Sequence, residues 1–246
     1  MKSIINDRID EENRKLYKKL SGKYDKTRYG SRSLSNYERI CNESIENVIN
    51  IKNNMSLLDV ATGTGRIPHH LSNTGADITA IDLTEEMLDR AKLKGSKTNI
   101  KFMVANARAL PFEDESFDLV TSIRFFHLLD QPIQEEVFKE MYRVAKPGGL
   151  IVFEHNNAFS GIFVGFLFDI ISIFKKEKLR GMIWPLEVEK KYSNYGKVKK
   201  RGLWFTGMGY ISKISYKLAQ KINSLGKYFP FYWFTNQILL VVKKPN

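Results

Sequence analysis

The sequence predicts an α/β fold, a doubly wound and mostly parallel sheet with helices on both faces. Short apolar runs alternate with helical patterns through the middle of the chain, as expected for strands joined by crossover helices. The first of these runs ends in a glycine-containing turn. At 246 residues, 43% hydrophobic and 27% charged, the chain can build one α/β domain with a complete core.

Residues 1–55 are predicted to form a helical cap. Residues 8–50 follow a helical pattern with a break at 21–35, where two glycines fall among polar residues, so we expect two helices and a loop. Residues 1–20 have mixed charge and no apolar segment, so we expect no export signal. The single cysteine, Cys41, cannot form an internal disulfide, which favours a reducing cytoplasm.

Residues 56–154 are predicted to form the core of the domain. Acids in the first turn after Thr84 favour a helix start there, and Pro147-Gly148-Gly149 stops the last helix before the fifth strand. Strands are expected at residues 56–61, 77–83, 100–105, 117–123 and 150–154, and helices at 66–73, 85–94 and 132–145. Right-handed crossovers bring the carboxyl ends of these strands to one edge, which we expect to hold a ligand.

Residues 155–234 do not continue the alternation and are predicted to form a variable cover. They include an apolar segment at 158–174, a basic run at 175–180, a basic loop at 190–201 and a basic amphipathic helix at 211–225. Residues 235–246 then hold a final strand, at 235–242, which returns to the sheet.

The whole net charge of +12 resides in residues 155–246, which hold 16 Lys+Arg, 4 Asp+Glu and 18 of the aromatic residues. Basic and aromatic side chains together suit an anionic partner such as a membrane surface, a nucleic acid or a phosphorylated substrate. A solvated basic face over an aromatic core explains the same composition equally well.

The glycine turn indicates a nucleoside cofactor. Gly63 and Gly65 let the backbone approach a ligand, and the carboxylate of Asp82, at the end of the second strand, can bind a ribose diol. The third glycine of a dinucleotide site is replaced by Pro68, and Asp59 before the turn would repel a pyrophosphate but attract an ammonium. This charge pattern favours S-adenosylmethionine (SAM) over NAD.

Several further motifs occur in order along residues 24–154. They are Leu58-Asp59-Val60-Ala61-Thr62-Gly63-Thr64-Gly65-Arg66, Ala80-Ile81-Asp82-Leu83-Thr84-Glu85-Glu86-Met87-Leu88, Ala105-Asn106-Ala107-Arg108-Ala109-Leu110-Pro111-Phe112 with Ser116-Phe117-Asp118, Phe126-His127-Leu128-Leu129, and Arg143-Val144-Ala145-Lys146-Pro147-Gly148-Gly149. On these motifs the chain resembles the class I SAM-dependent methyltransferases, in the small-molecule branch that includes the quinone-biosynthesis C-methyltransferases. The resemblance implies a Rossmann-like sheet of seven strands.

The resemblance also implies roles for ten residues. The methionine end of SAM would be held by Asp59 and the backbone around Ala61, Gly63 and Gly65, with Ile123 beside it; Asp82 would bind the ribose hydroxyls; Leu83 and Met87 would face the adenine, and Asn106 and Ala107 its edge. The chain departs from the common pattern at Ala61, which replaces a glycine, and at Asn106, which replaces an aspartate. S-adenosylhomocysteine would be the product.

Methyl transfer from a sulfonium is an in-line displacement, so the protein mainly aligns the acceptor and excludes water. His127, after the fourth strand, is the candidate general base, although a histidine that only packs locally fits the sequence equally well. Candidate substrate-binding residues are Tyr24, His155, Trp184 and Trp204, and no residues have metal-ligand spacing.

The aromatic, basic cover favours a small lipophilic acceptor of quinone, lipid or glycolipid type, and peripheral contact with an anionic membrane from the cytoplasm. Two alternatives remain. A nucleic-acid methyltransferase would use the same basic and aromatic residues, but Ile123-Arg124-Phe125-Phe126 follows the fourth strand where amino-methylating enzymes keep an Asn- or Asp-Pro-Pro-aromatic motif. A SAM-binding regulatory protein would bind the cofactor and turn over no acceptor.

Overall fold

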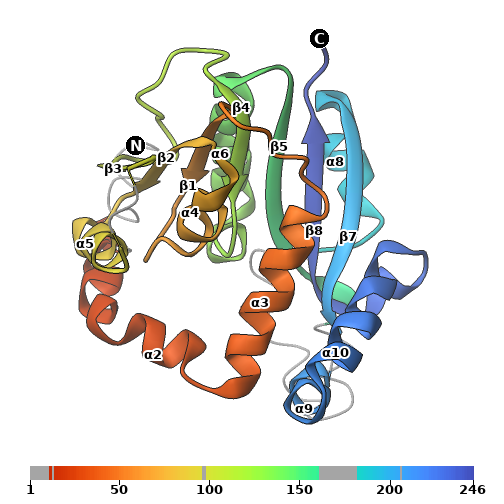
Figure 1. Ribbon diagram of the computed structural model, residues 1–246. Helices are drawn as coiled ribbons and strands as arrows, with labels where there is room; N and C mark the ends of the chain where they lie inside the picture. Colours follow the sequence, from red (N-terminus) through yellow and green to blue (C-terminus); the bar gives the residue numbers. More distant parts are fainter. Residues whose placement is uncertain (1–10, 13, 96–97, 161–181, 206) are drawn as a thin grey trace.

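A computed structural model describes residues 11–12, 14–95, 98–160, 182–205 and 207–246. Its centre is a sheet with the strand order β3-β2-β1-β4-β5-β8-β7, to which the two-residue β6 adds beside β5 (Figure 1). The strands are β1 (Ser56–Val60), β2 (Asp77–Asp82), β3 (Ile100–Val104), β4 (Phe117–Ser122), β5 (Ala145–Asn157), β6 (Met182–Ile183), β7 (Lys197–Phe205) and β8 (Thr235–Lys243). The predicted fold class is confirmed.

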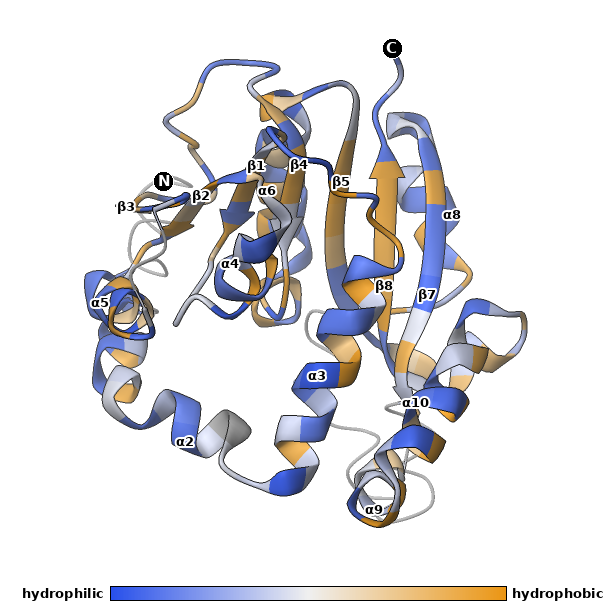
Figure 2. Cartoon of the chain, viewed as in Figure 1, coloured by the Kyte–Doolittle hydropathy of each residue, from blue (hydrophilic) through white to orange (hydrophobic). Residues whose placement is uncertain are grey.

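Strands β1 to β5 pair in parallel, whereas β8 runs antiparallel between β5 and β7. The middle strands are hydrophobic along most of their length, as expected for strands buried on both faces (Figure 2). The carboxyl ends of β1, β2 and β4 therefore lie at one edge of the sheet, close to where the strand order reverses between β1 and β4.

Helices cover both faces of the sheet. On one face, Cys41 and Ile45 of α3 and Ile67 and Leu71 of α4 pack into a single buried cluster with the sheet. On the other face, side chains of α6 and α8 form the second cluster, around Phe138. The helices of these layers are α3 (Arg32–Glu46), α4 (Arg66–Leu71), α6 (Gln131–Val144) and α8 (Glu187–Tyr192), and α5 (Glu85–Leu93) follows β2.

The predicted break at residues 21–35 is wrong for most of its length. A 3-10 turn, η1 (Ser21–Lys23), leads directly into α2 (Tyr24–Tyr29), and α3 starts at Arg32 with the Ser31 hydroxyl accepting from the Leu34 N–H. A glycine inside a helix costs only about 1 kcal/mol, which packing against other elements can offset. Helix α2 thus runs below the carboxyl edge of the sheet, between α5 and α3 (Figure 1).

Two expectations for the last third are also corrected. The predicted basic loop at 190–201 is the end of α8 followed by the edge strand β7, where lysines are a common protection against pairing with another chain. The predicted helix at 211–225 is two helices, α9 (Met208–Ile214) and α10 (Tyr216–Asn223), because the Ser215 side chain caps the second by accepting from the Leu218 N–H. Residues 161–180, with most of the predicted apolar segment and the basic run, lie outside the described residues.

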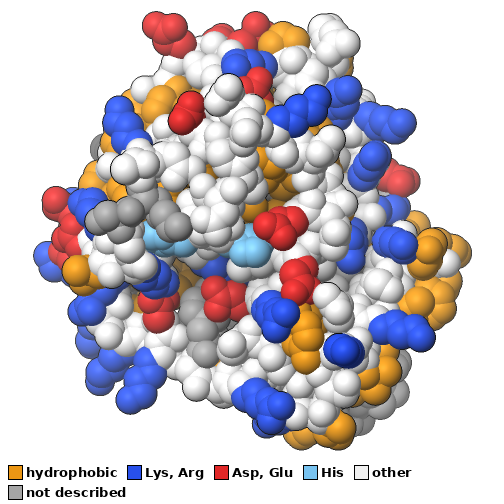
Figure 3. Space-filling model, in the orientation of Figure 1, with side chains coloured by type: hydrophobic (Ala, Val, Ile, Leu, Met, Phe, Trp, Pro, Cys, Tyr) orange, Lys and Arg blue, Asp and Glu red, His pale blue; other side chains and the backbone are white. Residues whose placement is uncertain are grey.

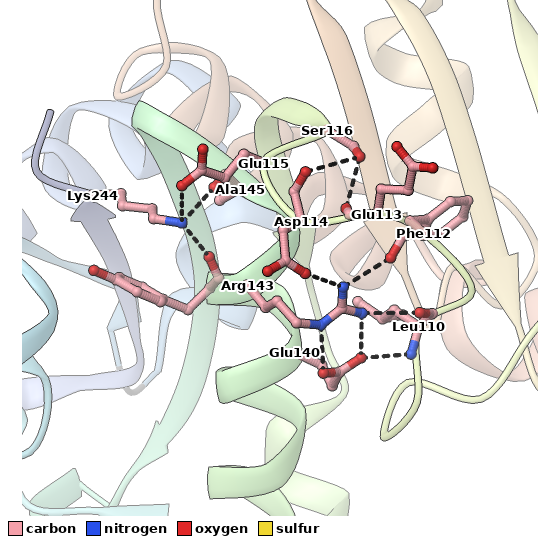
Figure 4. A network of polar contacts seen from close by, with 11 residues as sticks. Leu110, Phe112, Glu113, Asp114, Glu115, Ser116, Glu140, Arg143, Ala145 and Lys244 are labelled. Atoms are coloured by element: carbon pink, nitrogen blue, oxygen red, sulfur yellow. Dashed lines mark hydrogen bonds and ion pairs between the residues drawn. The ribbon is translucent and has the colours of Figure 1, made fainter.

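A polar network fixes the long connection between β3 and β4 (Figure 4). Arg143 of α6 pairs with Glu140 at 2.7 Å and Asp114 at 2.8 Å, and donates to the carbonyls of Leu110 and Phe112. Glu140 in turn accepts from the Leu110 N–H at 2.8 Å. The network thus anchors residues 110–114 of this connection to α6.

Candidate active site

A cavity opens at the carboxyl edge of the sheet, where the loops after β1, β2 and β3 meet. Seven of the ten residues predicted to bind the cofactor line it, namely Ala61, Gly63, Asp82, Leu83, Met87, Asn106 and Ala107. The other three, Asp59, Gly65 and Ile123, are not among its lining residues. The order of motifs along the sequence was therefore enough to predict most of one wall of this cavity.

The turn after β1 has the backbone conformation that glycine favours. Gly63 and Gly65 have φ angles of +56° and +77°, and Ala61 adopts +57° despite its side chain. A Cβ atom on Gly65 would lie 2.8 Å from the Cβ of Ala91, so this glycine lets α5 pack against the turn. Gly63 has open space where its Cβ would be, as a backbone cradle for a ligand requires.

Asp82 shapes the turn and faces the cavity. Its two carboxylate oxygens accept the backbone N–H groups of Gly63, at 2.7 Å, and Thr84, at 2.9 Å. Burial raises the pKa of Asp82, and these N–H groups oppose that shift because they stabilise the charged form. Each oxygen keeps a second lone pair, so the carboxylate can still accept the two hydroxyls of a ribose.

Asp59 is buried in β1 and does not line the cavity. Its side chain is 2% exposed, and Oδ1 accepts the hydroxyl of Thr121 at 2.6 Å. Burial raises the pKa of Asp59 to about 6, although the hydrogen bonds and Arg66 act in the opposite direction. From this position the carboxylate contributes charge beneath the turn.

The loop after β3 forms the opposite wall. The side chain of Asn106 accepts the N–H of Arg108 at 2.9 Å, which fixes the direction of its amide. Arg108 also lines the cavity and pairs with Glu136 of α6 at 2.8 Å. Together with Leu83 and Met87, these residues give an apolar face beside a polar edge, which is the arrangement an adenine ring needs.

The N-terminal helices complete the cavity. Arg14, Tyr17 and Tyr24 are lining residues, and only Tyr24 was expected from the sequence. Asp25, next in α2, accepts the hydroxyl of Thr64 in the glycine turn at 2.6 Å and pairs with Lys94 at 2.8 Å. These contacts tie α2 to both the turn and the end of α5.

A second cavity, of about 520 Å³, lies between the N-terminal helices and the sheet. Half of its lining residues are aromatic or aliphatic, with Leu20, Leu34, Tyr37 and Trp204 among them, and the other half are polar and include the cations Lys23 and Arg124. Tyr24 and Arg124 line both cavities, so the two meet at these side chains.

Arg124 was not predicted as a site residue. It lies two residues after the end of β4, has a φ of +67°, and donates from Nη1 to the hydroxyl of Tyr37 at 3.0 Å. Glu154, buried at the end of β5, lies close enough for the charge of Arg124 to lower its pKa, although burial raises that pKa overall. The position of Arg124 at the carboxyl end of a central strand was the signal that could have identified it.

The remaining predicted site residues do not lie together in the structure. Trp204 lines the second cavity, and Trp184 lines neither cavity. His127 lies half-buried in η3 (Phe126–Leu128) and lines neither cavity. His155, predicted to contact the substrate, is fully buried, with Nε2 2.8 Å from the Tyr192 hydroxyl. It lies in the core and lines neither cavity.

Comparison with known proteins finds similar sequences over part of the chain. Residues 58–153 match the family described as methyltransferase domain. A demethylmenaquinone methyltransferase of Staphylococcus aureus is 34% identical over 149 residues, which are 58% of this chain and 59% of that protein. A ubiquinone/menaquinone biosynthesis C-methyltransferase of Rickettsia prowazekii is 43% identical over 109 residues, 40% of this chain and 43% of that protein. The chain thus aligns with less than two thirds of the length of these relatives.

Solved structures show the same fold. A SAM-dependent methyltransferase of Thermotoga maritima has a TM-score of 0.64 at 16% identity, covering 93% of this chain and 98% of that one. Phosphoethanolamine N-methyltransferase 2 of Haemonchus contortus, bound to S-adenosylhomocysteine, has a TM-score of 0.59 at 17% identity, covering 91% and 59%. The resemblance noted in the sequence motifs is confirmed.

Proposed function

We propose that this chain is a class I SAM-dependent methyltransferase and moves the methyl group of SAM to a small lipophilic acceptor. Its residues 58–153 match a methyltransferase domain. The observation that carries the proposal is the pair of adjoining cavities, one with the predicted cofactor residues and one with aromatic walls. Bound SAM would supply a methyl group made electrophilic by its sulfonium. The protein would bring the acceptor into line with that methyl group.

The residues of the first cavity fit SAM. In this assignment Asp82 binds the ribose diol, the turn around Gly63 receives the methionine end, and Asn106 accepts from the adenine amine. Asp59 adds negative charge below the ammonium. Tyr24 closes the cavity from α2, which limits the entry of water.

The second cavity fits an apolar acceptor that carries an oxygen group. Trp204 packs edge-on against Tyr37 with ring centroids 5.1 Å apart, so the two rings form one aromatic surface against which a flat ring can stack. Arg124, at the junction with the first cavity, would stabilise negative charge on an acceptor oxygen next to the methyl group. The relatives named for quinone biosynthesis support an acceptor of this class for the present chain.

We further propose that the acceptor reaches the protein from a membrane surface. Tyr210 and Ile214 of α9 and Phe229 are 78%, 85% and 72% exposed. Hydrophobic and basic side chains lie together over α9 and α10 (Figure 3). The contact in this proposal is peripheral. Across the described part of the chain no helix is both long and apolar enough to cross a bilayer.

The two alternatives have less support. A nucleic-acid methyltransferase would need a continuous basic path into the site, whereas the second cavity has two cations, Lys23 and Arg124, beside five aromatic and aliphatic residues. A regulatory SAM-binding protein would not need a second cavity that meets the first.

Tryptophan fluorescence tests the acceptor cavity. The chain has 3 tryptophans, and only Trp204 lines this cavity. We expect menadione, a naphthoquinone, to quench part of the emission saturably, and the saturable part to disappear in Trp204→Phe while it persists in the matched control Trp184→Phe. Saturable quenching that survives in Trp204→Phe would place the quinone elsewhere and contradict the proposal.

A further inference from the structure

A third cavity, of about 290 Å³, lies between α3, β7 and α10, away from both cavities of the active site. Arg201 of β7 reaches it from the sheet, and Lys217 and Lys221 reach it from α10. The two lysines are one helical turn apart, so they share a face of α10. Three cations therefore converge on one small space.

Arg201 has no acidic partner among the residues that the structure describes. Its side chain is half-buried, and its Nε lies out of solvent with no hydrogen-bond acceptor. Burial lowers the pKa of Arg201, and only Cys41 acts against that shift. A desolvated guanidinium without a partner is costly, so an arginine kept in this state points to an anion that is not part of the fold.

The one acid in the cavity wall is already occupied. Glu43 accepts from Arg39 at 3.2 Å, from the Tyr216 hydroxyl at 2.8 Å and from Gln220 at 2.6 Å. Arg39 is not a lining residue of this cavity. The wall therefore has three cations, Arg201, Lys217 and Lys221, and one acid, Glu43. The side chain of Glu43 thus holds α3 to α10 and leaves Arg201 unpaired.

We propose that this cavity binds a phosphate group. Arginine offers a planar pair of N–H donors that matches phosphate oxygens, and lysines at the mouth add charge without fixed geometry. The volume suits a small anion, and the lining also offers the neutral polar side chains Ser44, Asn47 and Ser224.

A lipid headgroup is the source that the surroundings favour. Leu218, next to Lys217 in α10, is exposed, and Ile214 at the end of α9 continues the apolar surface. A phospholipid headgroup in the cavity would lie where such side chains can enter the acyl region. This site rests on cavity geometry and charge, so it stands independently of the methyl transfer.

The test compares the unmodified chain with Arg201→Met, and with Lys197→Gln as a matched control on the same strand. Adding inorganic phosphate at constant ionic strength should raise the melting temperature of the unmodified chain and of Lys197→Gln by about 3 °C. Arg201→Met should melt no lower than the unmodified chain in phosphate-free buffer and should lose the rise. No rise in the unmodified chain, or a rise that survives in Arg201→Met, would overturn the proposal.

A second variant and a lipid arm complete the test. Lys217→Gln with Lys221→Gln changes only exposed side chains, and it should at least halve the phosphate-induced rise, whereas a full rise would overturn the proposal. Co-sedimentation with phosphatidylglycerol vesicles then identifies the source. A several-fold loss of binding in Arg201→Met supports a lipid headgroup, and unchanged vesicle binding beside a lost phosphate effect supports a free phosphate.

Discussion

Two aspartates at neighbouring strand ends have different tasks, which the sequence alone could not separate. Asp82 faces the cavity and is held by backbone N–H groups, whereas Asp59 is buried below the turn and bonded to Thr121. Ala61, in the same turn, has a positive φ that the common glycine would adopt without strain. The burial of the two carboxyl groups and the positive φ of Ala61 each cost local stability.

Replacing Asp82 by Asn should weaken the binding of S-adenosylhomocysteine at least tenfold. The variant keeps one acceptor oxygen but loses the charge and the second oxygen that the ribose hydroxyls would use. Isothermal titration calorimetry measures the change. Asp77→Asn, at the exposed start of the same strand, should bind as the unmodified chain does, and equal affinities for the two variants would refute the ribose assignment.

Replacing Asp59 by Asn should stabilise the protein at pH 8. The folded pKa of Asp59, about 6, lies above its unfolded value of 3.8, so the folded state favours the neutral form and loses that advantage as pH rises from about 4 through 6. A difference of about two pKa units corresponds to at most about 3 kcal/mol. Asp59→Asn should therefore raise the free energy of unfolding by much of this amount at pH 8, and by less than about 1 kcal/mol at pH 4.

Urea unfolding at the two pH values checks the result. A destabilised Asp59→Asn variant at pH 8 would show that the charge supports the fold. The same variant should bind SAM more weakly, because it lacks the charge below the ammonium, so stability and affinity should move in opposite directions.

At the scale of elements, the helices before β1 and the segment from β7 to α10 form the proposed acceptor side of the site. Helix α2 closes the first cavity through Tyr24 and is tied down by Asp25, and Trp204 near the end of β7 lines the second. Helices α9 and α10 pack against α3, with Asn36 donating to the Ser212 carbonyl at 2.8 Å. The exposed apolar surface of α9 is therefore connected to the wall of the acceptor cavity.

Exposed apolar residues on this side should control membrane binding. We expect Ile214→Ser combined with Phe229→Ser to lower binding to phosphatidylglycerol vesicles several-fold, because each change removes an exposed side chain that could enter the lipid. Leu93→Ser on α5 is the control, since Leu93 is comparably exposed, at 78%, and α5 lies near the β3 end of the sheet whereas α9 lies near the β7 end (Figure 1). Equal loss in the control would contradict a defined docking surface.

At the scale of the whole molecule, the sequence predicted the regular part well. Most core strands and helices lie close to their predicted positions because their periodic patterns agree with their burial. The fifth strand is the exception: it was predicted at 150–154, whereas β5 runs from Ala145 to Asn157 and includes Pro147-Gly148-Gly149. The cofactor wall followed from motifs that place residues at strand ends. The acceptor side could not be predicted, because the positions of α2, β7 and Arg124 depend on packing between segments far apart in sequence. The local composition of the α2 and β7 segments instead suggested loops.

The central claim is that a methyl group passes from SAM to a lipophilic acceptor. The most direct measurement incubates the protein with methyl-labelled SAM and a fractionated cell extract, with Asp82→Asn as the inactive control, and follows the label into each fraction. We predict label in the organic phase, at a rate at least tenfold lower for the control. Label confined to nucleic acid, or no transfer above the control, would contradict the account.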